Sequence, residues 1–260
     1  MRICFLLLAL LLPLSAVAQQ DSRLQPLQTA DASRGWEAVG RLNMRGVGFC
    51  TATLIAPDRV LTAAHCLYDR RTGARLEDAQ LEFLAGWRTG RAEAIRGVRR
   101  VAIWPGFDFA AGAAIGNVPS DIAVLELDRP VRTTSIHPFD VASQRVATGS
   151  SVAVVSYARQ RSESPSIQQR CRVLDQRNDG VSVFTCDIDY GSSGAPVFAE
   201  ESGELRIVSL ISARIEGRET PMSLGMQLSE RVRALESTLD TGGTVQGPQG
   251  ARETARFLRP

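Results

Sequence analysis

The chain has 260 residues, of which 44% are hydrophobic and 22% are charged, and this is the composition of an ordinary globular protein. Its 30 basic and 28 acidic residues leave a formal net charge of +2, and no long run of one sign occurs. These values give no indication of nucleic acid or of an anionic membrane as a partner. The length allows one large β domain or two small ones.

Residues 1–18 are predicted to be a secretory signal peptide. Arg2 supplies a positive start, residues 3–12 are apolar, and residues 16–18 (Ala-Val-Ala) fit the small-x-small pattern that precedes a cleavage site. An uncleaved anchor is the alternative, but the apolar run is too short to span a bilayer. We therefore expect an exported protein, either secreted or periplasmic, that does not contact a membrane once the signal is removed.

Export places the cysteines in an oxidising compartment. Cys4 leaves with the signal peptide, and the four that remain imply two disulfides. The local pairs Cys50–Cys66 and Cys171–Cys186 are favoured because each brackets a plausible hairpin. A metal site is the alternative, but the chain has only two histidines and lacks the close Cys-x-x-Cys pairs of zinc sites. We expect neither a metal nor a cofactor.

The rest of the chain is dominated by short strand signals. Residues 19–35 are polar and are predicted to form a flexible lead-in or a short pro-segment before ordered structure begins near Trp36. Apolar or alternating runs predict strands at 37–44, 47–55, 59–62, 81–84, 91–103, 121–127, 150–157, 170–174, 181–186, 197–198, 205–212 and 225–228. Helical spacing predicts a terminal helix over 228–239, and the Gly-rich residues 241–260 predict a disordered tail. Together these elements indicate an all-β fold.

Residues 189–196 read Asp-Tyr-Gly-Ser-Ser-Gly-Ala-Pro. A serine between glycines lies on a turn that can hold its hydroxyl out toward a substrate. A serine hydroxyl is a poor nucleophile by itself and needs a base beside it, with a third group to orient that base. An ordinary Gly/Ser surface turn is the alternative interpretation.

Two residues upstream could supply the base and its partner. His65 follows an apolar strand directly, whereas the second histidine, His137, lies in a proline-flanked connection with no obvious partner. Asp121 heads an apolar run, and a carboxylate that enters the core needs a partner such as a histidine. A turn-capping role for Asp121 is the alternative. The order His65, Asp121, Ser193 is one of the known chain orders of a Ser-His-Asp triad.

These stretches resemble the trypsin-like (chymotrypsin-fold) serine peptidases. Residues 48–55 and 60–66 are similar to the histidine region of that family, residues 121–125 to its aspartate strand and residues 191–196 to its serine loop. The likeness extends from Trp36 to Leu239 and fits the secreted bacterial branch, which includes glutamyl-endopeptidase-like enzymes. The resemblance implies two antiparallel six-stranded β-barrels, at about 36–130 and 145–228, followed by the C-terminal helix.

The resemblance also implies a role for each site residue. His65 and Asp121 would come from the first barrel and Ser193 from the second. Ser193 rather than Ser192 would be the nucleophile, because the motif serine is followed by Gly-x-Pro. The oxyanion hole would be formed by the backbone N–H groups of Gly191 and Ser193. The Cys50–Cys66 pair matches the bridge that the family has beside its histidine.

Two departures from the family pattern affect activation and specificity. Ser192 stands where the animal enzymes have an aspartate that pairs with a newly released N-terminus, so we expect no activation of that kind. Asp187 takes the position of the pocket base, which would favour Lys or Arg substrates, and Ser212 and Arg214 would line the pocket edge. Arg214 could pair with Asp187 or attract an acidic side chain.

The sequence therefore predicts an exported, monomeric serine endopeptidase that acts on protein or peptide substrates. A catalytically silent chymotrypsin-fold binding protein is the alternative. An α/β hydrolase would need helices between its strands and the chain order Ser, Asp, His, and the sequence shows neither.

Overall fold

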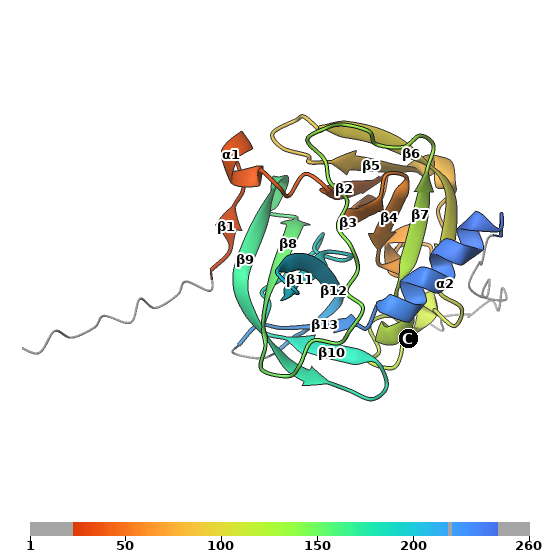
Figure 1. Cartoon of the computed structure of the whole chain (residues 1–260). Coiled ribbons are helices and arrows are strands. Elements are labelled where there is room, and N and C mark those ends of the chain that lie inside the picture. The colour runs from red at the N-terminus through yellow and green to blue at the C-terminus, as the bar shows by residue number, and fades with distance from the viewer. Residues whose placement is uncertain (1–22, 218–219, 244–260) are drawn as a thin grey trace, which may run out of the picture.

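The computed structural model describes residues 23–217 and 220–243, and the statements below refer to these residues. Two β units lie side by side, and a helix crosses the outside of one of them (Figure 1). Within this part of the chain, no helix is long and apolar enough to cross a membrane. The predicted signal peptide, and the predicted tail from residue 244 onward, lie outside the described residues.

The first unit is a closed antiparallel barrel in the order β2-β3-β4-β7-β6-β5. Its strands are β2 (Val39–Met44), β3 (Gly48–Ala56), β4 (Arg59–Thr62), β5 (Leu81–Ala85), β6 (Ala94–Ile103) and β7 (Ala123–Leu127). Strand β7 is buried along its whole length; four of its five residues are apolar, and the fifth, Glu126, pairs with Arg99 and Arg100 of β6. The predicted six-stranded first barrel is confirmed.

The second unit is a ring-like sheet, in which six strands close on themselves and β1 pairs with the edge of β9. Its strands are β1 (Gln25–Pro26), β8 (Ser151–Ala158), β9 (Arg161–Gln176), β10 (Val181–Phe184), β11 (Pro196–Glu201), β12 (Glu204–Ile215) and β13 (Met222–Met226). Strand β9 is much longer than the predicted 170–174. Its first half buries the polar residues Ser164, Ser166 and Gln168, so the sequence lacks the apolar alternation that marks a strand.

The two units share an aromatic contact at their junction. The Phe198 ring on β11 lies 4.6 Å from the ring of Phe139 in the connection and 5.3 Å from the ring of Trp36, measured between ring centroids. Such offset and edge-on arrangements add to the area that aromatic side chains bury. Trp36 therefore joins the start of the first barrel to the second unit.

The described part of the 19–35 segment is packed, which differs from the expected flexible lead-in. Gln25 pairs with Ile167 of β9, and Leu27 is buried. The short helix α1 (Ala30–Ser33) follows, and its first turn is capped by the Thr29 hydroxyl. Pairing with β9 and burial of Leu27 hold this part of the segment in place, although its polar composition predicts flexibility. Removal of this segment as a pro-segment stays a prediction.

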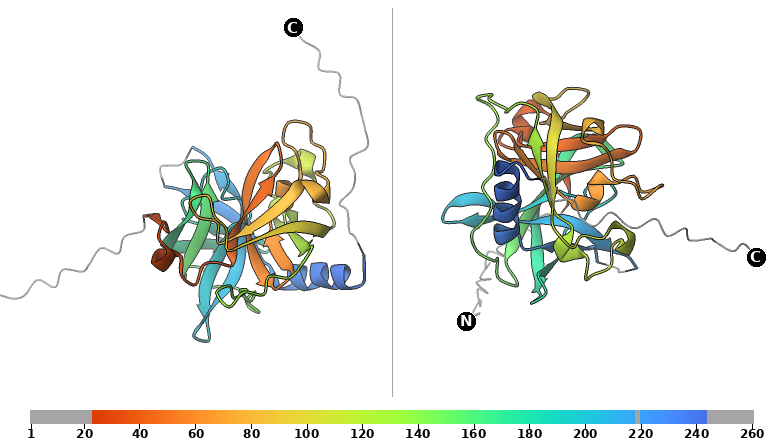
Figure 2. Two further views of the ribbon diagram at one scale, coloured as in Figure 1. Left: turned by 90° about the horizontal axis from the view of Figure 1, so that it is seen from above. Right: turned by 90° about the vertical axis from the view of Figure 1, so that its right-hand side faces the viewer.

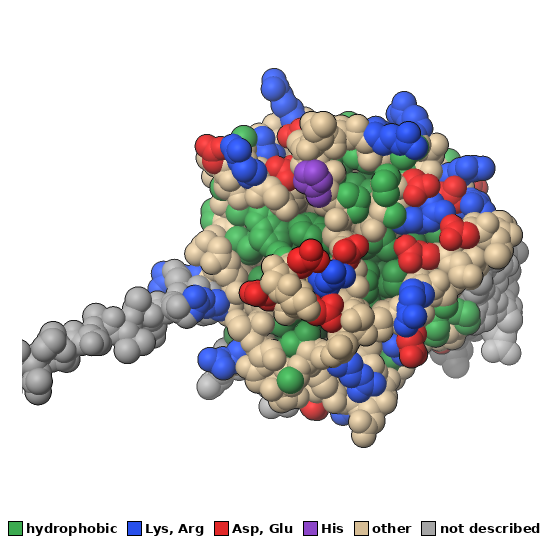
Figure 3. Space-filling view, viewed as in Figure 1, with side chains coloured by type: hydrophobic (Ala, Val, Ile, Leu, Met, Phe, Trp, Pro, Cys, Tyr) green, Lys and Arg blue, Asp and Glu red, His purple; other side chains and the backbone are tan. Residues whose placement is uncertain are grey.

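The C-terminal helix α2 (Ser229–Asp240) returns from the second unit to the first. It buries Val232, Leu235 and Leu239, packs against β6 and β7, and lies along the outside of the first barrel (Figure 2). The loops hold short 3₁₀-helices, named η1 (Ala64–Leu67), η2 (Asp78–Gln80), η3 (Phe109–Ala111) and η4 (Val118–Ser120). On the face seen in Figure 3, acidic and basic side chains are interspersed rather than segregated.

Candidate active site

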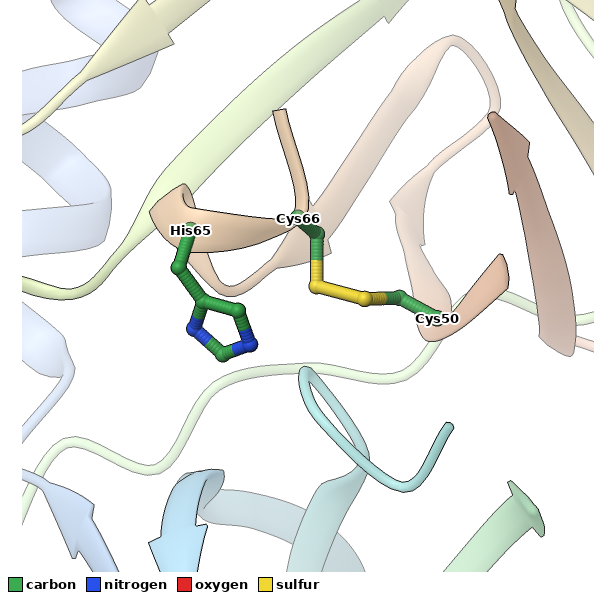
Figure 4. Close-up of side chains that lie close together, drawn as sticks. All are labelled: Cys50, His65 and Cys66. Atoms are coloured by element: carbon green, nitrogen blue, oxygen red, sulfur yellow. A yellow bond between two sulfur atoms is a disulfide. The ribbon is translucent and has the colours of Figure 1, made fainter. Parts of the chain in front are cut away.

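His65 lies in η1, directly after strand β4. Strand β4 pairs with β7 over its whole length, which brings His65 beside Asp121, two residues before β7. The Cys50–Cys66 disulfide, with Cα atoms 6.1 Å apart, ties this turn to β3, and the imidazole lies beside the disulfide (Figure 4). The second predicted disulfide, Cys171–Cys186, is also present.

Asp121 is buried, with 4% of its surface exposed, and its carboxylate accepts three hydrogen bonds. Oδ1 accepts from the His65 backbone N–H at 2.8 Å. Oδ2 lies 2.7 Å from His65 Nδ1 and accepts from the Ser212 hydroxyl at 2.5 Å. A buried carboxylate with this many partners is held in one orientation, and it orients the imidazole in turn.

These contacts decide the charge of Asp121 and the tautomer of His65. Burial alone raises the pKa of the Asp121 carboxyl. The nearby His65 and the hydrogen bonds from His65 and Ser212 outweigh burial and hold that pKa below its usual value. An ionised carboxylate only accepts hydrogen bonds, so His65 Nδ1 carries a proton. In the neutral imidazole, Nε2 is then the free base.

Ser193 lines the same cleft as His65 and Asp121. The cleft has a volume of about 470 Å³, and Phe107, Ile188, Asp189, Tyr190, Ser212 and Arg214 are among its other lining residues. Ser193 is partly exposed. The structure thus places the three predicted triad residues around one cavity.

The neighbouring Ser192 is in a different position. It is fully buried, with 0% of its surface exposed. Its hydroxyl lies 3.1 Å from the Tyr157 carbonyl, to which it donates, and accepts the Asp189 N–H at 3.3 Å. The backbone of the serine loop needs glycine on both sides of this serine pair, since Gly191 and Gly194 have φ of +98° and +76°.

The predicted pocket base, Asp187, lies outside the cleft. Its side chain is exposed, whereas Cys186 and Ile188 on either side are buried, and the cleft is lined by Asp189 instead. This alternation places every second residue of the segment outward. The sequence does carry a signal for this position: Cys186 and Ile188 are apolar, and two buried neighbours turn the Asp187 side chain toward solvent.

Ser212 and Arg214 do line the cleft, as expected. The Ser212 hydroxyl is bonded to Asp121, so it belongs to the hydrogen-bond network of His65 and Asp121. Arg214 does not pair with Asp187. Its guanidinium lies 2.9 Å from Glu216 and 4.0 Å from Asp189, and both side chains of the Arg214–Glu216 pair are exposed.

Sequence reasoning missed an aromatic side chain at the mouth of the cleft. Tyr190 is exposed, and the guanidinium carbons of Arg159, Arg214 and Arg70 lie 4.7, 5.7 and 5.9 Å from the centroid of its ring. Arg70 comes from the polar loop after η1 and Arg159 from the turn between β8 and β9. No motif or periodicity marks either loop, so only the fold brings them together.

The side chains of Cys50, His65 and Cys66 come close enough to suggest a metal site. The two sulfurs are bonded to each other, however, and a metal-binding cysteine must be a free thiolate. His65 is also engaged by Asp121. This group therefore does not fit a metal ion, and no step of the chemistry is derived through one.

Comparisons with known proteins identify the family and support the fold. Residues 50–206, more than half of the chain, match the family described as trypsin-like peptidase domain. The chain is 24% identical over 156 residues to a glutamyl endopeptidase of Bacillus licheniformis, in a region that covers 60% of this chain and 47% of that protein. The chain thus spans about half the length of the curated relative. The fold is similar to the structure of a Glu endopeptidase in complex with MPD, at 17% identity and a TM-score of 0.66, over 86% of this chain and 97% of that one. The chain belongs to the trypsin-like peptidase family.

Proposed function

We propose that this protein is an exported serine endopeptidase that hydrolyses peptide bonds through Ser193, His65 and Asp121. The observation that carries the proposal is the hydrogen-bonded pair of His65 and buried Asp121 at a cleft that Ser193 also lines. The predicted signal peptide and the two disulfides support export. Protein or peptide substrates follow from membership of the family.

In the proposed reaction, His65 Nε2 takes the proton of the Ser193 hydroxyl as its oxygen attacks the substrate carbonyl carbon. The negative charge that forms on the carbonyl oxygen is stabilised by the N–H groups of Gly191 and Ser193. Asp121 stabilises the imidazolium. His65 then gives the proton to the leaving amine. In the second half of the reaction, His65 takes a proton from the water molecule that attacks the acyl-enzyme, and it returns this proton to the Ser193 oxygen as the acid product leaves.

A fluorophosphonate probe tests the proposal, because it labels only an activated serine. We expect labelling of the wild type on Ser193, located by mass spectrometry of the labelled peptide, and none in Ser193→Ala. Ser151→Ala is the matched control, since Ser151 is exposed at the start of β8 and outside the cleft. Absence of labelling in correctly folded wild type would favour the catalytically silent binding protein.

A preference for acidic side chains in the substrate is a second proposal about the same cleft. Its support is Arg214, which lines the cleft, and the name of the relative, a glutamyl endopeptidase. Both side chains of the Arg214–Glu216 pair are exposed, so water screens the pair and Arg214 can exchange Glu216 for a substrate carboxylate. Asp189 lines the same cleft and would have the opposite effect, because its carboxylate would favour Lys or Arg side chains in the substrate.

Cleavage of a peptide library by wild type, Arg214→Ala and Glu216→Gln decides between these residues. We expect wild type to prefer Glu or Asp, Arg214→Ala to lose the preference, and Glu216→Gln to raise it by up to about 5-fold. A wild-type preference for Lys or Arg would show that Asp189 sets the specificity.

A further inference from the structure

The two N–H groups proposed to bind the oxyanion are oriented by the peptide carbonyls on their far sides. A trans peptide is planar, so its C=O and N–H point in opposite directions. The Tyr190 carbonyl accepts the Arg159 N–H at 2.7 Å, which turns the Gly191 N–H the other way. The Ser192 carbonyl accepts the Ala195 N–H at 3.0 Å, which does the same for the Ser193 N–H. The loop between these two peptides must be held for both donors to converge.

Thr51 on β3 makes the contacts that hold it. The Thr51 hydroxyl lies 2.9 Å from the Gly191 carbonyl and 3.0 Å from the Tyr157 backbone nitrogen. A hydroxyl has one proton to donate, and the Tyr157 N–H is itself a donor. The Thr51 proton therefore goes to the Gly191 carbonyl. The Thr51 backbone N–H also donates to the Ser193 carbonyl at 2.9 Å.

Thr51 is itself held from both sides. It is fully buried, with 0% of its surface exposed, and its own carbonyl accepts the Thr62 hydroxyl at 2.9 Å. Its neighbour Cys50 is bonded to Cys66 in the turn that carries His65. A rigid, buried support is what a group needs when its task is to fix other groups within a fraction of an ångström.

Ser192 completes the arrangement on the side of the second unit. Its hydroxyl bonds the Tyr157 carbonyl at 3.1 Å, while the N–H of the same Tyr157 bonds Thr51. The backbone of Tyr157 is thus held between two hydroxyls, one from each unit. Ser192 stands where animal members of the family have the aspartate that pairs with a new N-terminus. Among the described residues, this network is made by neutral hydroxyls and backbone groups and includes no chain terminus.

We propose that Thr51 is a positioning residue that holds the Gly191–Ser192 peptide so that the Gly191 and Ser193 N–H groups converge on the reacting carbonyl. The oxyanion loop is then formed without proteolytic release of an N-terminus. This inference rests on the proposed peptidase function, but it makes a separate claim about a hydroxyl that bonds the Gly191 carbonyl and the Tyr157 N–H rather than the reacting atoms.

The test compares Thr51→Val with Thr53→Val by peptide hydrolysis. Thr53 lies two residues further along β3, is 1% exposed, and its hydroxyl has no hydrogen-bond partner among the described residues. Both substitutions replace a buried hydroxyl by a methyl group, but only the first removes hydrogen bonds. We expect Thr51→Val to lower kcat by about 10- to 100-fold with KM nearly unchanged, because a loosened oxyanion donor approaches the effect of a lost one. Thr53→Val should keep the wild-type kcat.

Two further measurements separate positioning from folding. Thr51→Ser keeps the hydroxyl and should restore kcat to within a few-fold of wild type. A peptide boronate, which forms a tetrahedral adduct, should lose affinity for Thr51→Val by a similar factor, while a product peptide should bind as before. If Thr51→Val does not fold, Thr51→Ala, which leaves space at this position, is compared with Thr51→Ser in the same assays.

Equal kcat in Thr51→Val and Thr53→Val would overturn the role of Thr51, and so would a loss that serine does not restore. Failure of the proposed function itself looks different: the wild type would then neither hydrolyse peptides nor react with a fluorophosphonate.

Discussion

The backbone of Gly194 lies against Thr51 with no room for a side chain between them. A Cβ atom at residue 194 would lie 2.3 Å from the Thr51 carbonyl oxygen and 2.3 Å from the Thr62 hydroxyl. The φ of Gly194 is +76°, a conformation that L residues other than glycine rarely adopt. The serine loop of the second unit and strand β3 of the first are therefore fitted backbone to backbone.

Gly194→Ala should consequently destabilise the protein more than the same substitution at a glycine that has a similar positive φ but no atoms near its added Cβ. Gly203, in the turn between β11 and β12, has a φ of +83°, and a Cβ atom there would meet nothing within 4 Å beyond its chain neighbours. Gly203→Ala should cost about 1–2 kcal/mol from backbone conformation alone. Gly194→Ala adds overpacking, typically another 1–3 kcal/mol. Urea denaturation measures both, and equal losses would mean that the loop is not closely fitted.

Asp121→Asn should lower kcat by up to about 10⁴-fold while leaving the fold intact. An asparagine amide can donate a hydrogen bond to His65 Nδ1, which favours the tautomer with its proton on Nε2, and that imidazole cannot act as the base. Ser212→Ala removes one bond to the carboxylate and should cost far less. Steady-state kinetics on a peptide substrate measures both variants, and a near-normal Asp121→Asn enzyme would exclude Asp121 from the triad.

Stability in acid should also depend on Asp121, because the pKa of its carboxyl is held below the usual value in the folded chain. Such a group stabilises the fold at pH values above its unfolded pKa, about 3.9, and this contribution is lost as the pH falls through the folded pKa. The free energy of unfolding of wild type should therefore fall more steeply below about pH 4 than that of Asp121→Asn. Urea titrations between pH 2 and 6 would show parallel curves if Asp121 were not involved.

The two disulfides should differ in their effect on activity. Their sequence separations of 16 and 15 residues are nearly equal, so loss of either should cost about 3 kcal/mol of stability. Replacement of Cys50 and Cys66 by alanine should in addition lower kcat, because this bridge joins the turn of His65 to the strand of Thr51. Replacement of Cys171 and Cys186 should lower kcat less. Thermal unfolding and kinetics on both double variants check the comparison.

Much of the fold, and the candidate residues of the site, can be predicted from the sequence because the signals are local. A strand that ends shortly before His65, an aspartate that heads the β7 segment and a serine between glycines each occupy a short stretch, and their order along the chain relates them. The terminal helix and both disulfides follow from similarly local patterns, whereas the six-stranded first barrel is implied by the family resemblance.

The supports of the site could not be predicted, because they join residues that are distant in sequence. The Ser212 hydroxyl reaches Asp121 across 91 residues, and the Thr51 hydroxyl reaches Gly191 across 140. A buried hydroxyl in a strand leaves the same sequence pattern whether it has a partner, as Thr51 has, or none among the described residues, as with Thr53. The direction of a side chain is also hard to predict from the sequence: Asp187 was expected to line the pocket, but it is exposed outside the cleft.

Helix α2 has a consequence for how the protein is made. The outer surface of the first barrel, at β6 and β7, is covered by a helix from the other end of the described chain, and Arg59 of β4 pairs with Asp240 at 2.8 Å. During synthesis the residues of the first barrel are made long before those of α2. The surface at β6 and β7 that α2 covers therefore stays exposed until the second unit has been made. A chain that cannot bury this surface until its last helix is present completes the packing of its first barrel only after the residues of α2 have been made.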